Sequence, residues 1–183
     1  MATRARQRLL ATAEDLFYAE GVRAVGLERL LSESGVGRAS FYRHFASKDD
    51  LVLAVLTERD ERWLAWLREA VEAVDEPADR PLAVFDALAQ RFARKDFRGC
   101  AFINTMIEVA DPDAPAHRVA DRHKRRVIEY LGELLTAAGR TDAEELAGEF
   151  ALLIDGAIVT ALRENSPAAA ERAGRIAARL LAD

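Results

Sequence analysis

The segment that most constrains this chain is 26–48, in which two short amphipathic helices meet at a glycine-bearing turn. Leucines recur at helical spacing over 27–33, which predicts a helix with one apolar face. Gly35 stands just past the end of that helix, where a residue with positive φ usually turns the chain. A second helix is predicted over 38–45, with two phenylalanines one turn apart on its inner face. Two short helices joined steeply by such a turn make a helix-turn-helix.

The second of these helices carries the hydrogen-bonding side chains expected of a helix that reads DNA. Arginines can donate to guanine edges or phosphates, serine and histidine to bases or phosphates, and tyrosine and lysine to phosphates. The candidates of these types are Arg38, Arg43, Ser40, His44, Tyr42 and Lys48. The alternative is that these side chains are ordinary solvent-exposed polar groups that do not contact DNA. The sequence leaves open which of them would contact bases and which phosphates.

The same segment resembles the signature of TetR-type bacterial transcriptional regulators. The resemblance rests on 35–51, Gly-Val-Gly-Arg-Ala-Ser-Phe-Tyr-Arg-His-Phe-Ala-Ser-Lys-Asp-Asp-Leu, and above all on its Tyr-x-His-Phe-x-x-Lys core. Gly26 and Gly37 depart from the pattern, because the family usually carries Ser or Thr at these two N-caps. Glycine supplies no capping oxygen, so a phosphate contact at Gly26 would come from its backbone N–H. The complete DNA-binding set predicted in this way is Gly26, Arg38, Ala39, Ser40, Tyr42, Arg43, His44 and Lys48.

The resemblance also implies a function for the whole chain. A TetR-type regulator is a homodimer that binds a near-palindromic operator, more often as a repressor than as an activator, and that a small-molecule effector releases. Two recognition helices would enter successive major grooves about 34–36 Å apart. The effector, the operator, the regulated genes and the direction of the response stay open.

Composition and charge fit an all-α DNA-binding protein. Half of the 183 residues are hydrophobic, 31% are charged, and there are only 10 Gly and 5 Pro. The net charge is −5, yet residues 1–48 hold eight basic and five acidic side chains, a net +3. The remaining residues hold 18 basic and 26 acidic side chains, a net −8. A positive head on a negative body would orient the molecule on a polyanion.

Helix signals along the chain predict an all-α fold of about nine helices. We expect a three-helix DNA-binding domain over 1–47 and a larger helical domain over 48–183 for effector binding and dimerisation. Ser47 is the predicted N-cap of a long helix that joins the two and runs to about residue 74. The last two helices, about 142–164 and 167–182, carry more apolar surface than one body needs. This predicts a four-helix bundle with a second copy, as the family resemblance also implies.

A helix near 102–109 suggests where an effector would bind. It is mostly apolar, and its Asn104 and Glu108 lie four residues apart and therefore on one face. The Arg-Gly-Cys turn before it resembles one TetR-type subgroup in which this segment borders the ligand cavity. The candidate effector-binding residues are Phe85, Leu88, Phe102, Asn104, Met106, Glu108, His123 and Phe150. The alternatives for the polar pair are a satisfied buried hydrogen bond or a solvent-facing pair.

No metal or cofactor is predicted, although His123 beside Asn104 and Glu108 leaves a metal cluster open. An enzyme is disfavoured, because the sequence has no Ser/His/Asp order, Cys/His pair, Gly-rich phosphate loop or string of metal ligands. Cys100 followed by histidines is more typical of buried packing. A helical adaptor without a DNA role is the other alternative. A single cysteine, no membrane-spanning run and no signal-peptide pattern predict a cytoplasmic protein.

Overall fold

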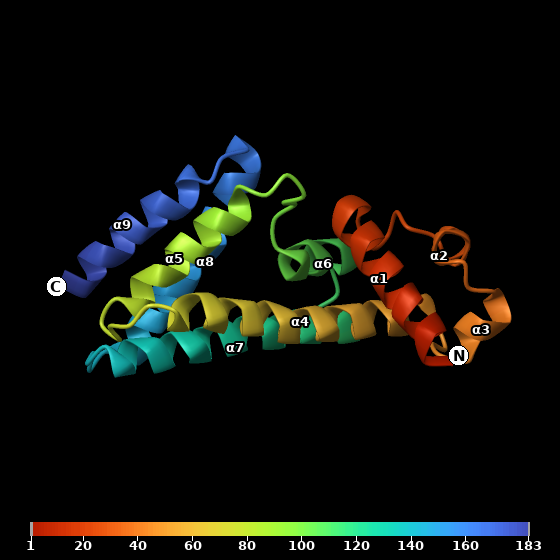
Figure 1. Ribbon diagram of the computed structural model, residues 1–183, viewed down its shortest axis with the longest axis horizontal. Coiled ribbons are helices and arrows are strands. Elements are labelled where there is room, and N and C mark those ends of the chain that lie inside the picture. Colours follow the sequence, from red (N-terminus) through yellow and green to blue (C-terminus); the bar gives the residue numbers. More distant parts are fainter. Residues whose placement is uncertain (1, 183) are drawn as a thin grey trace. The chain divides into compact units, whose positions relative to one another are not determined.

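The computed structural model describes residues 2–182 and places nine α-helices and no strand in them, which confirms the all-α prediction (Figure 1). The helices are α1 (Ala2–Glu20), α2 (Leu27–Ser34), α3 (Arg38–Tyr42), α4 (Lys48–Glu72), α5 (Arg80–Phe92), α6 (Ala101–Val109), α7 (Pro115–Ala137), α8 (Ala143–Glu164) and α9 (Ala168–Ala182). None of the described helices is long and apolar enough to span a membrane.

The described chain forms two compact units. Unit 1 holds 2–60 together with 101–121, and unit 2 holds 61–100 together with 122–182. Unit 1 therefore contains α1, α2, α3, the first half of α4, α6 and the start of α7. Unit 2 contains α5, α8 and α9 with the remaining parts of α4 and α7.

The turn between α2 and α3 forms as the sequence predicts. Gly35 lies in the left-handed region at φ 62°, and its N–H donates to the Ser32 carbonyl at 3.3 Å. The N–H of Val36 reaches back to the Leu31 carbonyl at 3.2 Å. These two bonds make a Schellman motif, which satisfies carbonyls that the end of a helix otherwise leaves unpaired.

A substitution at Gly35 tests this turn. A Cβ there would meet only the Arg8 guanidinium, at 3.8 Å, so the cost of alanine is backbone strain rather than a clash. We expect Gly35→Ala to lower the free energy of unfolding by about 1 kcal/mol. Gly35→Asn is the control, because asparagine adopts this conformation more readily. Chemical denaturation measures both, and equal losses for the two variants would contradict this explanation.

The recognition helix α3 is shorter than predicted, ending at Tyr42 rather than at residue 45. The N–H of His44 bonds to the Phe41 carbonyl at 2.8 Å, an i→i−3 contact that tightens the last turn. Phe45 still donates to the same carbonyl at 2.9 Å, so the two phenylalanine rings stay on the inner side with centroids 5.9 Å apart. The core around them is apolar and comes from α1, α2 and the turns between helices: Leu9, Ala13, Leu16, Phe17, Val25, Leu30 and Val36.

The predicted start of α4 is confirmed. The Ser47 hydroxyl accepts the N–H of Asp50 at 3.1 Å, as an N-cap does. Pro81 occupies the first turn of α5, where its missing N–H leaves no bond unmade.

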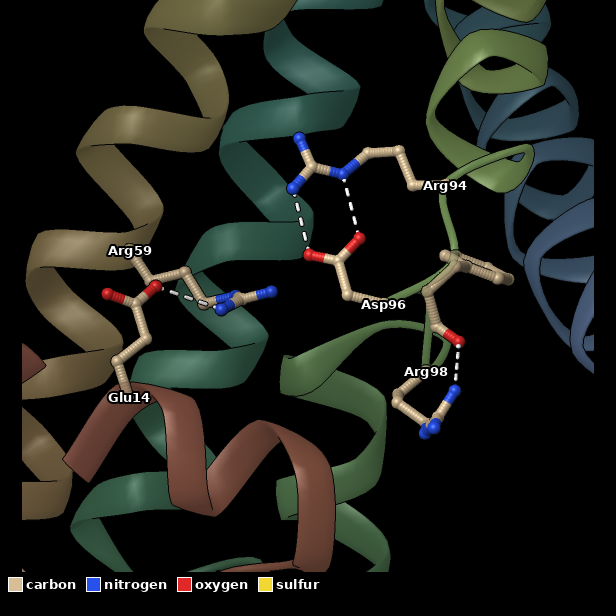
Figure 2. Close-up of polar contacts among 6 residues, drawn as sticks. Glu14, Arg59, Arg94, Asp96 and Arg98 are labelled. Atoms are coloured by element: carbon tan, nitrogen blue, oxygen red, sulfur yellow. Dashed lines mark hydrogen bonds and ion pairs between the residues drawn. The ribbon is translucent and has the colours of Figure 1, made fainter. Parts of the chain in front are cut away.

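In unit 2, α5 packs against α8 and α9 (Figure 1). After α5 the Arg94 guanidinium donates two hydrogen bonds to Asp96, at 3.0 and 2.8 Å, and lowers the pKa of that carboxyl to about 2 (Figure 2). Arg98 donates to the Phe97 carbonyl, and Gly99 at φ 78° then turns the chain toward α6.

Candidate DNA interface and effector region

The two buried phenylalanines of the helix-turn-helix decide which side chains of α3 face outward. Phe41 is fully buried and makes a T-shaped contact with the Tyr42 ring, with ring centroids 5.2 Å apart, whereas the Tyr42 side chain is 50% exposed. Of the predicted DNA-binding positions, Arg38, Ala39, Tyr42 and Arg43 are exposed, and Ser40 and His44 are half-buried. The outward face of α3 is therefore polar and accessible, and the DNA contacts themselves stay predictions.

Gly26 lies at the N-cap of α2 in an extended conformation and is exposed. The space around its Cα is open, so a larger residue would fit there. Gly37 has the corresponding place at the N-cap of α3. Both helix starts are thus where the sequence pattern puts them, without a side-chain cap.

Ion pairs with carboxylates affect which arginines of this surface are available to bind DNA. Arg38 pairs with Glu28 of α2, and both side chains are exposed, so the pair is weak and a phosphate can replace it. Arg29 is engaged by Glu20 and Glu33, which raise its pKa, while the guanidinium lowers the pKa of Glu20. Arg38 therefore remains a candidate for exchange onto DNA, whereas Arg29 is held by two carboxylates.

Lys48 has a structural role that the sequence analysis did not predict. Its ammonium donates to the carbonyls of Val22 and Val25, at 2.8 and 3.0 Å. A lysine ammonium has three donors, so two of them tie the start of α4 to the turn between α1 and α2. A lysine in the first turn opposes the helix dipole, and this unfavourable placement is the signal that could have indicated a second role. Phosphate contact by Lys48 stays a prediction.

The candidate effector residues divide between the two units. Phe102, Asn104, Met106 and Glu108 belong to α6 in unit 1. Asn104 and Glu108 share one face, as predicted, and line a pocket closed by residues of α1 and α4 that include Glu14, Tyr18 and Arg59. This pocket has a volume of about 20 Å³, which is room for a single water molecule.

Two of the residues around this pocket form a mostly buried ion pair. Arg59 donates to the Glu14 carboxylate at 2.9 Å, and its guanidinium lies 4.2 Å from the centroid of the Tyr18 ring (Figure 2). The pair joins α1 to α4 within unit 1.

Glu108 lies beside the turn between α1 and α2. Its carboxylate accepts the backbone N–H of Arg23 at 2.8 Å, and the Arg23 guanidinium donates to the Val109 carbonyl at 3.4 Å. This contact could not be predicted from the sequence, because it joins residues 85 positions apart. Effector binding by Glu108 stays a prediction. Its carboxylate already accepts the Arg23 N–H, so an effector would have to share or replace that hydrogen bond.

The other four candidates lie in unit 2. Phe85, Leu88 and Phe150 are buried in its core, with the two phenylalanine rings 5.6 Å apart. His123 is buried and makes a T-shaped contact with the Trp63 ring, with ring centroids 5.0 Å apart. A ligand that contacts these groups would have to replace part of this packing. Among the described residues, no three His, Cys, Asp or Glu side chains lie close enough together to hold a metal ion.

A larger groove in unit 1 shares the lining residues Val22 and Val52 with the pocket beside Asn104. It has a volume of about 330 Å³, within the range of small-molecule sites. The turn after α1, the start of α4, the end of α6 and the start of α7 form its walls, with Val22, Arg23, Lys48, Asp49, Val52 and Val109 among the lining residues. None of the predicted effector residues lines this groove. Its walls come from four separate parts of the chain, which no local pattern connects.

Comparisons with known proteins agree with this arrangement. Residues 9–55 match the family described as bacterial regulatory proteins, tetR family, and residues 77–176 match the LmrA/YxaF-like C-terminal domain of transcriptional regulators. A crystal structure of a TetR-family transcriptional regulator from Streptomyces coelicolor is 34% identical, covers 96% of both chains and superposes with a TM-score of 0.85.

Two regulators of Escherichia coli are also similar. The transcriptional repressor NemR is 28% identical over 79% of this chain and 73% of its own length. The crystal structure of its reduced form covers 94% of both chains with a TM-score of 0.86. The transcriptional regulator YjdC is 24% identical over 96% of this chain and 93% of its own length. With both parts of the sequence and the fold in agreement, this chain belongs to the TetR family of transcriptional regulators.

Proposed function

We propose that this chain is a dimeric repressor that binds a near-palindromic operator through α3 and that a small-molecule effector releases. The observation that supports DNA binding most directly is the division of α3 into a buried aromatic side and an exposed polar side. Phe41 and Phe45 hold the helix, and Arg38, Tyr42 and Arg43 stand outward from it. A helix presented in this way fits the major groove.

In this proposal different polar groups of the helix-turn-helix contact different parts of the DNA. The guanidinium groups of Arg38 and Arg43 donate to guanine edges or phosphates, and Ser40 and His44 donate nearby. Tyr42 and the N–H of Gly26 contact phosphates, and Ala39 lies against the bases. Lys48 contributes one donor to a phosphate while its other two hold the turn between α1 and α2.

We assign DNA binding to residues 1–47, and effector binding and dimerisation to 48–183. Dimerisation is supported by exposed apolar side chains on the surface of α8 and α9. Leu152 is 75% exposed, and Val159, Leu162 and Ile176 are about half exposed. Exposed apolar groups gathered on the last two helices are what a second copy would cover in a four-helix bundle.

The repressor role is supported by the likeness to NemR, which is a repressor. For an effector to act, it must bind the state with misplaced recognition helices more tightly than the state that fits DNA. The effector residues that we propose are those predicted from the sequence. One group, which includes Asn104, lies on α6 in unit 1, and the other, which includes Phe85 and Phe150, lies in unit 2.

Selection of double-stranded DNA from a random pool by the full-length protein tests the proposal. We expect enrichment of a near-palindrome and steeply salt-dependent binding. Failure to enrich any sequence, at low and at moderate salt, would overturn the proposed function.

The Arg43→Ala substitution tests the role of α3. Loss of a guanidinium that reads a base or phosphate is expected to weaken binding of the selected operator about tenfold or more. Arg122→Ala is the matched control, because Arg122 is an exposed arginine of α7 in unit 2. Fluorescence anisotropy measures both dissociation constants. Equal affinities for the two variants would remove Arg43 from the interface.

A further inference from the structure

The turn between α1 and α2, residues 21–26, is held by side chains from two other elements of unit 1. From α4, Lys48 donates to the carbonyls of Val22 and Val25. From α6, Glu108 accepts the N–H of Arg23 at 2.8 Å. The turn leads directly into α2, which begins at Leu27, so its position sets the position of the helix-turn-helix.

The contact with Glu108 depends on a close fit to the backbone. Gly21 ends α1 at φ 96°, and a Cβ at this position would lie 2.9 and 3.0 Å from the two oxygens of the Glu108 carboxylate. The carboxylate therefore occupies the space that a side chain at Gly21 would need. In the opposite direction, the Arg23 guanidinium donates to the Val109 carbonyl at 3.4 Å. Gly21, the backbone amide of Arg23 and the Arg23 guanidinium thus all contact the end of α6.

The place of α6 in the chain links this contact to unit 2. Residues 101–121 belong to unit 1 by their contacts, yet residue 100 before them and residue 122 after them belong to unit 2. Because α6 begins at Ala101, a rearrangement of unit 2 that shifts residue 100 would pull directly on the start of α6. The end of α6 meets the turn that precedes α2 through Glu108.

We infer that Glu108 is a positioning residue that links the state of α6 to operator affinity by holding the Arg23 amide. The inference rests on the proposed function, and it names the side chain through which that function is regulated. A carboxylate suits this task, because a hydrogen bond to a charged acceptor is stronger than one between neutral groups. When α6 moves, the bond is lost, the turn gains freedom, and α2 and α3 are no longer fixed for DNA.

Three variants of the full-length protein test the link. Glu108→Ala removes the acceptor, and Glu108→Gln keeps a neutral carbonyl acceptor of the same shape. Ile107→Ala is the matched control, because Ile107 is the neighbouring α6 residue and its side chain is 73% exposed. The probes are the operator selected by the unchanged protein and random double-stranded DNA. Amide hydrogen exchange at Arg23 and in α2 reports the contact itself.

We expect Glu108→Ala to weaken operator binding about tenfold, Glu108→Gln to recover most of that loss, and Ile107→Ala to bind as the unchanged protein does. Binding of random DNA and the salt slope should stay the same, because no phosphate contact is removed. Exchange at Arg23 and α2 should speed up while the helices of unit 2 keep their protection, which general destabilisation would not produce.

Two results would overturn the inference, and they are distinguishable. If the unchanged protein selects an operator and Glu108→Ala binds it equally well, the link through Glu108 is wrong and the proposed function stands. If the unchanged protein selects no operator, the proposed function fails and the link fails with it. Should Glu108→Ala not fold, Glu108→Gln decides. Operator binding that is weaker than that of the unchanged protein by less than tenfold, together with faster exchange of the Arg23 amide, supports the link. Unchanged or slower exchange, or unchanged or tighter operator binding, contradicts it.

Discussion

Phe41→Ala is expected to unfold the helix-turn-helix and to abolish operator binding. The Phe41 side chain is fully buried, and its ring contacts the rings of Tyr42 and Phe45. Truncating a buried phenylalanine costs about 3–5 kcal/mol, from lost burial and from the cavity that remains. Since whole domains are stable by only about 5–15 kcal/mol, this loss removes much of the stability of the small three-helix core. Urea denaturation and operator binding measure the two effects.

Tyr42→Ala is the matched control, because Tyr42 is the next residue and its side chain is half exposed. We expect this variant to keep its stability within about 0.5 kcal/mol, as surface substitutions usually do, while it loses operator affinity. Phe41→Leu, which keeps most of the buried volume, should lie between the two. If Tyr42→Ala destabilised the protein as strongly as Phe41→Ala, the division of α3 into a buried and an outward side would be wrong.

The parts of the fold that the sequence predicts are those that local chemistry controls. Gly35 marks the turn, since few other residues adopt its φ of 62° without strain, and Ser47 caps α4 from three residues away. The end of α3 was missed by a few residues because spacing alone does not distinguish an i→i−3 from an i→i−4 bond at His44.

The contacts that join distant segments could not be predicted in this way. The sequence predicts Lys48 as a phosphate contact. For Glu108 it predicts an effector contact, with a satisfied buried hydrogen bond or a solvent-facing position as the alternatives, and it indicates no partner for either residue. The structure gives each a backbone partner in the turn between α1 and α2, 23 to 26 residues from Lys48 and 85 from Glu108. Which chain segments meet depends on tertiary packing, and the groove of unit 1 was missed for the same reason.

Aspartates at Leu152 and Val159 are expected to convert the protein to a monomer and to weaken operator binding at least a hundredfold. The two residues lie seven apart on α8, hence on one face, and both are exposed in the single chain. In a symmetric dimer each substitution occurs twice, so four carboxylates would have to be buried or brought together, at several kcal/mol. A monomer also loses the gain that comes from binding two linked half-sites, about 10²–10⁴ in affinity.

Light scattering across a range of protein concentrations measures the assembly, and anisotropy measures operator binding. Ile107→Asp is the matched control, because Ile107 on α6 is 73% exposed, nearly the same as Leu152 at 75%. An aspartate there should leave the oligomeric state unchanged. A double variant at α8 that remained dimeric would place the interface on another surface. A variant that became monomeric but kept full operator affinity would contradict recognition by two linked half-sites, since one recognition helix would then suffice.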